Sequence, residues 1–408
     1  MNTFYGLKND LGIYNGEIPN MSFNFKNTSP ENCPNITFLR IEIDKKVSSE
    51  KYSDYMENYF KNMGINKNNF FTDISNYLSY EIGQPSHCYN GEIIRDGITF
   101  SNEHCKESFQ TLLDKEVILD GKVCIFKHKD RIVNIAGVMG DKSSSCNEET
   151  LTALVEFANF KPEAIIGKAL KYNLHSEAAH KFERGVDPLM QDLALRRFIK
   201  ITEDHADIKS LEVFSYGRDT YKSRHIPFNP TSINKILGTN IDKNEIEDRL
   251  KDLYFKFNET IEIPSFRNDI ISENDLAEEV ARSIGYDNIK QEETTIPKFN
   301  LSSKASKYYE VKEKLFRNGF YEVINFPFAR EKQEISIEID NPLDSNKKYL
   351  RSNLKNSLID NLIYNERRQK DSIKLFEISD IYTKDNITET KLGIIATGRQ
   401  GYNHRDFS

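Results

Sequence analysis

Two polar residues of this sequence are able to line a pocket that binds or hydrolyses a small ligand. His87 follows the proline turn Gln84-Pro85-Ser86 and comes eleven residues after Asn76. A histidine in that place can donate and accept hydrogen bonds near neutral pH. Glu156 lies inside the apolar run LTALVEFANF, where a carboxylate is costly to bury unless it is paired or faces a cleft. A histidine in such a loop more often has a structural role, with its hydrogen bonds made inside the protein. His87 and Glu156 therefore indicate a polar site without defining a reaction.

Glycines and small residues mark two further segments. Gly137 and Gly140 follow the apolar run 132–136, and glycines after a strand let backbone N–H groups approach a ligand. A tight structural turn needs the same residues. The segment HSEAAHKFERGVDP, residues 175–188, joins small residues to a charged run and a glycine turn, which is also typical of a polar surface loop.

Four acidic residues form another candidate site. Asp275, Glu278 and Glu279 are spaced i, i+3 and i+4, which places them on one face of a helix. Asp269 lies in the loop before that helix. Carboxylate oxygens gathered in this way suit Mg²⁺. Acidic side chains in the first turn of a helix also complement its dipole, so spacing alone favours a structural role.

The composition is that of a folded, mildly acidic protein. The chain has 408 residues, of which 38% are hydrophobic and 29% charged, and its net charge is −7. These values exclude collagen-like and disordered classes and give no whole-chain attraction to nucleic acid or membranes. The sequence has no apolar run of the roughly 18 residues that a membrane span needs, no visible signal peptide and no zinc-ligand spacing among its five cysteines. We expect a cytoplasmic location and no membrane partner.

Helices and strands that alternate along the chain must position these residues. Apolar and polar residues alternate over residues 34–44, which predicts a strand with one or both faces buried. Start and stop signals predict helices over 48–64, 162–173, 188–206, 231–238, 242–253, 273–284 and 308–319, and another after Leu354. Further strands are predicted at 260–266, 321–328, 335–340, 373–383 and 391–398. This order is typical of an α+β protein with several domains.

Taken together, the segments match one known family. DISNYLSYEIGQPSH, IAGVMG, HSEAAHKFERGVDP and PSFRNDIISENDLAEEVARSIGYDNI occur in this order, followed by NPLDSNKKYLRSNLKNSLIDNLIYNERR and IKLFEISDIY. The sequence resembles the beta subunit of bacterial phenylalanyl-tRNA synthetase over nearly its whole length. The resemblance implies an α+β, multi-domain fold with a mixed α/β editing domain, a small winged-helix-like module and a partial class II synthetase-like domain with an antiparallel sheet.

The resemblance, joined to shifts in composition, predicts four regions. Residues 1–30 are expected to be a remnant of an N-terminal structural region, and 31–219 the editing domain, which hydrolyses mischarged tRNA. Residues 220–300 are expected to form a helix–helix–strand–helix module with the acidic cluster, and 301–408 an incomplete catalysis-like domain. Against the family the chain is expected to be truncated at both ends, without the N-terminal tRNA-binding domain and the C-terminal anticodon-binding domain.

The resemblance also implies a function. The family's alpha2beta2 enzyme uses ATP to charge tRNA-Phe with phenylalanine at a site on the alpha subunit, and its beta subunit hydrolyses tyrosine misattached to tRNA-Phe. Tyrosine has one hydroxyl more than phenylalanine, and an apolar synthetic pocket rejects an added hydroxyl by only about 100-fold, so a second, hydrolytic site is useful. The expected partners are therefore the alpha subunit and tRNA-Phe.

Carried over residue by residue, the resemblance assigns both candidate sites. The editing pocket falls on Asn76, His87, Glu156, Ser176 and Ala178. Glu156 would accept a hydrogen bond from the phenol, and His87 would position water or the terminal ribose. Backbone N–H groups around Gly137 and Gly140 would bind the ester as substrate and hold its developing charge. The family's Mg²⁺ ligands, which face the alpha subunit, fall on Asp269, Asp275, Glu278 and Glu279. The resemblance thus favours a metal-binding role for the acidic residues over a purely structural one. It assigns no general base to the editing pocket.

Three positions depart from the family pattern. Ser176 replaces the usual threonine and keeps its hydroxyl, Asn66 takes the place of an arginine, and Asp141 replaces a glycine. The last two leave open an alternative, a non-catalytic module that assembles the complex and positions tRNA with a degenerate editing pocket. A third hypothesis is an unrelated cytosolic hydrolase that uses His87 and Glu156, although the sequence has no nucleophile elbow, P-loop or zinc motif.

Overall fold

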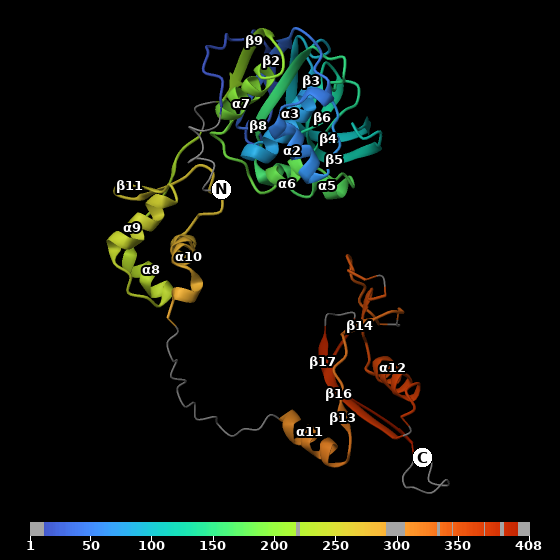
Figure 1. Cartoon of the computed structure of the whole chain (residues 1–408). Helices are drawn as coiled ribbons and strands as arrows, with labels where there is room; N and C mark the ends of the chain where they lie inside the picture. The colour runs from blue at the N-terminus through green and yellow to red at the C-terminus, as the bar shows by residue number, and fades with distance from the viewer. Residues whose placement is uncertain are drawn as a thin grey trace. The chain divides into compact units, whose positions relative to one another are not determined.

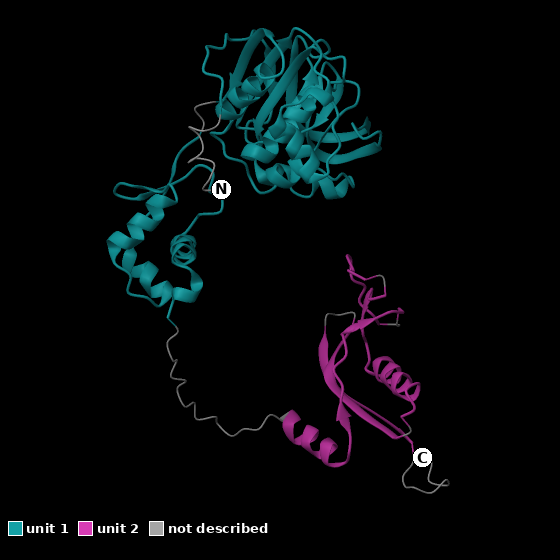
Figure 2. Cartoon of the chain, viewed as in Figure 1, with its two compact units in different colours: residues 1–292 teal, residues 293–408 magenta. Residues whose placement is uncertain are grey.

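The computed structural model describes residues 12–217, 221–290, 307–332, 335–344, 346–370, 372–383 and 387–398. It divides the chain into two compact units, residues 1–292 and 293–408 (Figure 2). Both units mix helices and sheets, so the expected α+β, multi-domain fold is confirmed. The first eleven residues of the predicted N-terminal remnant lie outside the described residues.

The centre of unit 1 is a four-stranded antiparallel sheet (Figure 1). Its order is β3 (His87–Asn90), β8 (Thr152–Asn159), β2 (Asn35–Ile43) and β9 (Ile208–Tyr216). Both faces of this sheet are covered: in β2, Phe38 belongs to one hydrophobic core and Leu39 to another. Because successive side chains alternate between the faces, coverage of both faces leaves every residue of β2 and β8 buried or half-buried. The strand predicted at 34–44 is therefore confirmed.

A second sheet shares the core that contains Phe38. It has five strands, β1 (Asn24–Asn27), β4 (Gly97–Gln110), β5 (Glu116–His128), β6 (Arg131–Ile135) and β7 (Met139–Gly140). β1 runs parallel to β4, and the other neighbours are antiparallel. Beside this sheet pack the short helices α4 (Pro162–Ile165) and α6 (Glu177–Phe182). The helix predicted at 162–173 is wrong as one element, because Gly167 at a φ of 74° separates α4 from α5 (Lys168–Lys171).

Three helices cover the other face of the four-stranded sheet. They are α2 (Asp54–Met63), α3 (Phe70–Ile82) and α7 (Gln191–Glu203). A separate 3-10 turn, Ser49–Lys51, precedes α2, so the helix predicted from residue 48 begins later. α3 is not among the predicted elements. Asn69 caps it by accepting a hydrogen bond from the Thr72 N–H, and Gly83 ends it at a φ of 79°.

A small module with its own hydrophobic core completes unit 1. It consists of β10 (Arg224–Ile226), α8 (Pro230–Leu237), α9 (Lys243–Asp252), β11 (Lys256–Phe257), β12 (Ile261–Ile263), α10 (Glu273–Ile284) and the 3-10 turn Tyr286–Asn288. The predicted order of helix, helix, strand and helix is present. Asp242 caps α9, whereas α8 is capped by Asn229 and begins one residue before the predicted range.

Unit 2 has one main sheet, β13 (Tyr321–Glu322), β16 (Ser372–Tyr382) and β17 (Thr388–Gly398). β16 and β17 form the expected antiparallel pair, while β13 runs parallel to β16. Helices α11 (Lys307–Arg317) and α12 (Lys355–Glu366) and the pair β14 (Phe328–Ala329) and β15 (Tyr349–Leu350) complete the unit. In place of the strand predicted at 335–340, the described residues there contain a single bridge from Glu338 to Tyr349. Across the described parts of both units, every helix is too short or too polar to span a bilayer.

A buried ion pair holds unit 2 together. Arg351 donates from Nη1 to Glu377 Oε1 at 2.8 Å, and both side chains are almost fully buried. The other Glu377 oxygen accepts a hydrogen bond from the Asn325 side chain at 2.8 Å. A buried ion pair is costly to break from one side, because the remaining charge is left without compensation.

We therefore expect Arg351→Met to lower the free energy of unfolding of unit 2 by about 3–5 kcal/mol. Hydrogen exchange of the β16 amides, followed by mass spectrometry, reports on this unit alone. Lys391→Met is the matched control, since Lys391 pairs with Glu389 on the exposed side of β17. Its effect is expected to stay below about 0.5 kcal/mol. Equal exchange in both variants would contradict the assigned role of Arg351.

Candidate functional site

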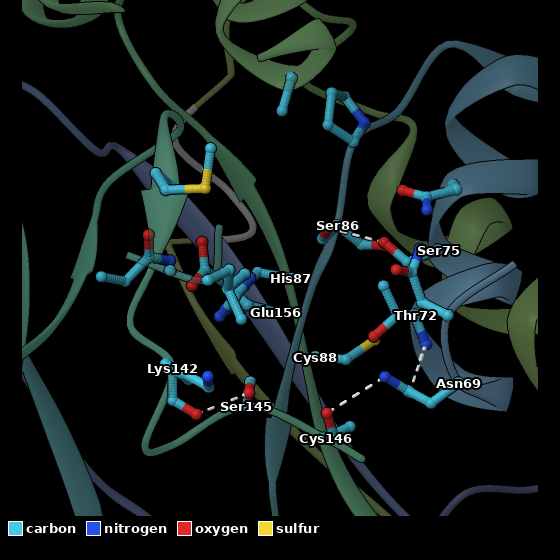
Figure 3. Close-up of a pocket in the computed structure, with 18 of the residues that line it drawn as sticks. Asn69, Thr72, Ser75, Ser86, His87, Cys88, Lys142, Ser145, Cys146 and Glu156 are labelled. Carbon is cyan, nitrogen blue, oxygen red and sulfur yellow. Dashed lines mark hydrogen bonds between the residues drawn. The ribbon is translucent and has the colours of Figure 1, made fainter. Parts of the chain in front are cut away.

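A cavity of about 660 Å³ in unit 1 brings together all the residues predicted for the editing pocket. Its lining includes Asn76, His87, Gly137, Gly140, Glu156, Ser176 and Ala178. These residues come from α3, β3, the β6–β7 turn with β7, β8 and the start of α6. Five segments between residues 76 and 178 therefore meet in one pocket, which Figure 3 shows in close-up.

Glu156 lies at the centre of the site. It pairs with His87 across β8 and β3, and only 4% of its surface is exposed. The Tyr89 hydroxyl donates to Glu156 Oε2 at 2.8 Å, and Asn134 Nδ2 donates to the Tyr89 oxygen at 2.9 Å. Burial raises the pKa of Glu156 to about 8, although the polar side chains of Tyr89 and Asn134 act in the opposite direction. Near neutral pH this carboxyl is therefore largely protonated and uncharged.

His87 is also uncharged at neutral pH. Burial lowers its pKa to about 4, against a smaller opposing effect of Asp141. Its ring packs edge-on against Tyr89, with 4.4 Å between the ring centroids. The Nε2 atom is buried and has no hydrogen-bond partner among the described residues. A buried nitrogen without a partner is costly, so a ligand or water that bonds to His87 would relieve that cost.

Gly140 makes room for His87. A Cβ at position 140 would lie 2.2 Å from the Cε1 atom of His87, closer than two carbon atoms approach without a shift. Gly137 has a φ of 68°, which favours glycine, and a Cβ there would come within 3.0 Å of Phe160. Both glycines line the cavity, but the N–H of Val138 between them donates to Ile135 within the turn. That amide is not free for a ligand.

The remaining predicted residues form the sides of the cavity. Ser176 caps α6, since its Oγ accepts a hydrogen bond from the Ala179 N–H at 3.2 Å. A hydroxyl that accepts this bond satisfies one of the free N–H groups at a helix start, which any serine or threonine can do. Ala178 lies one position before Ala179 in the same helix. Asn76 lies in α3 across the cavity.

Several residues of the site were not predicted. The cavity is also lined by Asn68, Asn69, Thr72, Ser75, Asn134, Lys142, Ser143, Ser145, Cys146 and Asn147, among others. In Figure 3, Thr72 and Ser75 come from α3 and Asn69 from its N-terminal cap, while His87 and Glu156 come from the strands. The spacing of Asn69, Thr72 and Asn76 places them on one face of a helix, which is the signal that would have revealed this wall.

Of the three departures from the family pattern, Ser176 lines the cavity, while Asn66 and Asp141 do not. Asn66 is exposed in the segment before α3. Asp141 is buried and accepts hydrogen bonds from the N–H and hydroxyl groups of Ser143 and Ser144. Its carboxylate therefore organises the loop at the cavity edge instead of entering the cavity.

Two of the four acidic residues predicted to bind Mg²⁺, Asp269 and Glu279, pair with arginine side chains. Arg267 donates to both oxygens of Asp269, at 2.9 and 2.5 Å, and to Glu279 at 2.5 Å. Arg282 also donates to Glu279. Asp275 accepts from the N–H groups of Ile271 and Ser272 in the capping box of α10, and Glu278 is exposed.

These contacts shift the charge states of the cluster. The bonds from Arg267 lower the pKa of Asp269. Burial alone would raise the pKa of Glu279, but Arg267 and Arg282 more than offset it and lower the pKa overall. Across the described residues, no three His, Cys, Asp or Glu side chains are arranged to hold a metal ion.

Three family models match the chain in succession. Residues 35–207 match the family model of the B3/4 domain, and residues 226–286 match that of the tRNA synthetase B5 domain. Residues 291–406 match the model of the phenylalanyl tRNA synthetase beta chain CLM domain. The candidate pocket lies in the B3/4 match and the acidic cluster in the B5 match.

Similar proteins share one name, phenylalanine–tRNA ligase beta subunit. The protein from Francisella tularensis subsp. tularensis is 30% identical over 343 residues, which cover 79% of this chain and 43% of that protein. The one from Clostridium tetani is 30% identical over 367 residues, 83% of this chain and 45% of that protein. The one from Psychrobacter arcticus is 26% identical over 426 residues, 97% of this chain and 52% of that protein. The chain spans about half the length of these relatives.

Among solved structures, an N-terminal fragment of the phenylalanyl-tRNA synthetase beta subunit from Pyrococcus horikoshii is similar at 11% identity and a TM-score of 0.33. The matched region covers 67% of this chain and 78% of the fragment, and no conclusion is based on this similarity. The three domain models, matched in succession from residue 35 to residue 406, and the shared name of the relatives lead to one conclusion. The chain belongs to the phenylalanine–tRNA ligase beta-subunit family.

Proposed function

We propose that this chain hydrolyses the ester of tyrosine on tRNA-Phe, in the cavity around Glu156. The observation that carries the proposal is a buried carboxyl group that lines a cavity and is bonded through only one described side-chain hydroxyl. A pocket that contains a buried polar group discriminates strongly in favour of a ligand that hydrogen-bonds to it. The phenol of tyrosine supplies such a bond, and the ring of phenylalanine does not.

The charge state of the site agrees with a neutral phenol as the ligand. Glu156 is largely protonated near neutral pH and His87 is uncharged, so a phenol enters without having to compensate a buried charge. A phenol and a carboxyl group can each donate and accept a hydrogen bond, which allows them to pair in either direction.

His87 supports the hydrolytic step in this proposal. Its unpartnered Nε2 is available to position the attacking water or the terminal ribose hydroxyl. With a pKa of about 4, His87 is a weak base at neutral pH, so we assign no general base to it. Because the Val138 N–H is engaged in the turn, any stabilisation of the ester oxygen by backbone amides would have to come from the other residues of the segment 137–140.

The wider role follows from the family. We propose that the chain works with an alpha subunit in an alpha2beta2 assembly, where alpha charges tRNA-Phe with phenylalanine at the expense of ATP. The chain would then supply hydrolytic editing and part of the tRNA contact. The alternative is a non-catalytic module that assembles the complex and positions tRNA. Asp141, one of the two departures that motivated this alternative, bonds within its own loop and not in the cavity, which favours the editing hypothesis.

The acidic residues do not fit a preformed Mg²⁺ site. Arg267 bonds both oxygens of Asp269 and one of Glu279, so its guanidinium group already supplies the positive charge that a cation would bring. Ligation of Mg²⁺ by these carboxylates, as predicted from the family, would require Arg267 to move. We therefore derive no step of the proposed function from a metal.

The first prediction concerns the reaction itself. The 408-residue chain is expected to deacylate Tyr-tRNA-Phe, and Glu156→Ala to reduce its preference for Tyr-tRNA-Phe over Phe-tRNA-Phe by about ten- to a hundredfold, the value of one buried hydrogen bond. Release of labelled amino acid measures both rates. Glu212→Ala, a half-exposed position of the same sheet, is the control and should keep the preference. If the unmutated chain hydrolyses neither ester but binds the alpha subunit, the assembly alternative replaces this proposal.

The second prediction concerns pH. The pKa of Glu156 is higher in the folded chain, about 8, than in an unfolded one, where it is near 4.5. Between these values the folded state holds a proton that the unfolded state has lost, so the free energy of unfolding falls as pH rises. Compared with Glu156→Gln, which does not titrate, the unmutated chain should lose about 2–4 kcal/mol of stability between pH 5 and pH 8. Urea unfolding followed by circular dichroism measures this, and parallel pH curves for the two proteins would refute the assigned charge state.

The third prediction concerns Mg²⁺. Because Arg267 neutralises the acidic residues, roughly 10 mM Mg²⁺ should leave the thermal midpoint of the unmutated chain unchanged. Arg267→Met should lower the midpoint, and Mg²⁺ should restore part of it by binding the carboxylates that are freed. Arg249→Met, which breaks an exposed pair with Glu245, should show no response to Mg²⁺. A rise in the midpoint of the unmutated chain would show that the acidic residues bind the ion despite Arg267.

A further inference from the structure

We propose that Tyr89 is a specificity-determining positioning residue, whose hydroxyl fixes Glu156 so that one carboxyl oxygen is left for a hydroxylated ligand. The inference rests on the proposed function in naming that ligand a tyrosyl group. It assigns a role to a side chain that does not itself line the cavity. The Tyr89 hydroxyl therefore acts through Glu156.

The position of Tyr89 follows from the register of the sheet. His87 lies opposite Glu156 on the neighbouring strand, and Tyr89 lies two residues further along β3. Residues two apart on a strand point to the same face, so both side chains are next to Glu156. Tyr89 is fully buried in the core between the two sheets, and its hydroxyl reaches Glu156 Oε2 at 2.8 Å.

The direction of the hydrogen bonds is defined by Asn134. A phenol has one proton to donate, and the Tyr89 oxygen already accepts from Asn134 Nδ2 at 2.9 Å. Its single proton is therefore directed to Glu156 Oε2, which must accept. Because Asn134 belongs to the five-stranded sheet and Glu156 to the four-stranded sheet, the chain of bonds also ties the two walls of the site together.

This arrangement gives Glu156 two unequal oxygens. Oε2 is bonded to an internal phenol, and the carboxyl group as a whole lines the cavity. A second phenol, that of the ligand, can bond at the remaining oxygen, so that Glu156 lies between two phenols. Without the Tyr89 hydroxyl, Oε2 would lose its hydrogen-bond partner. The carboxyl group would then be free to rotate and form a hydrogen bond with Asn134 or with water. Selection for the hydroxylated ligand should then weaken.

The test measures binding, so that it does not depend on hydrolysis. L-Tyrosinamide and L-phenylalaninamide serve as probes, because they carry the two side chains without a reactive ester. Their dissociation constants for the 408-residue chain are measured by saturation-transfer NMR, and the ratio of the two constants is the readout. If Tyr89 had a purely structural role, its substitution would weaken the binding of both probes alike and would leave this ratio unchanged.

Tyr77→Phe is the matched control for Tyr89→Phe. Tyr77 is also a buried tyrosine of unit 1 that bonds a glutamate, Glu81, at 2.8 Å, but neither residue lines the cavity. Asn134→Leu keeps the side-chain volume nearly constant and removes the donor that directs the Tyr89 proton. This variant replaces Tyr89→Phe in the test if Tyr89→Phe does not fold. Circular dichroism establishes that each variant is folded.

We expect the unmutated chain and Tyr77→Phe to bind tyrosinamide about tenfold more tightly than phenylalaninamide. Tyr89→Phe should reduce this ratio to below about threefold, and Asn134→Leu should reduce it in the same direction. A folded Tyr89→Phe chain that keeps the ratio, or an unmutated chain without any preference, would overturn the proposal. If the preference depends on Tyr89 but the chain hydrolyses no Tyr-tRNA-Phe, the role of Tyr89 stands and the proposed hydrolysis fails.

Discussion

The burial of one carboxyl group, that of Glu156, is the constraint on which the site depends. A charged carboxylate between two sheets would be prohibitive, so the group is held largely neutral and bonded to a phenol. That phenol needs a donor of its own, and Asn134 supplies it from the opposite sheet. The hydrogen bonds that offset the cost of burying Glu156 therefore also connect the two walls of the cavity. Its polarity and its shape have one physical origin.

Close packing around this network explains the glycines and small residues of the motif. The ring of His87 lies against Tyr89, and on its other side it occupies the space that a Cβ of Gly140 would need. Any larger residue at 140 would push His87 toward Glu156 or out of its place. Gly140 of the GVMG sequence is thus required by the histidine beside it, whereas Gly137 is required by its positive φ and by the nearby ring of Phe160.

The sequence predicted the members of the site better than their contacts. Glu156 in an apolar run indicated a buried carboxyl with a partner, and the family resemblance gathered seven residues that the structure places in one cavity. The partner of Glu156, Tyr89, could not be predicted, because their contact depends on the register of β3 against β8, which no local sequence pattern determines. α3 was missed because Asn, Ser and Thr favour caps and turns, and packing on the sheet overrides that preference.

Three glutamates are buried among the described residues, Glu156, Glu279 and Glu377, and they are stabilised in two different ways. Glu279 and Glu377 are compensated by arginines, which keeps the glutamates fixed and leaves no capacity for a neutral ligand. Glu156 has no arginine or lysine partner among the described residues and is kept neutral instead. A cation there would bind the carboxylate permanently and close the site to a phenol. A neutral carboxyl group held by a single internal hydroxyl is the one arrangement of the three that retains hydrogen-bonding capacity for an uncharged hydroxyl, and it is the one that faces a cavity.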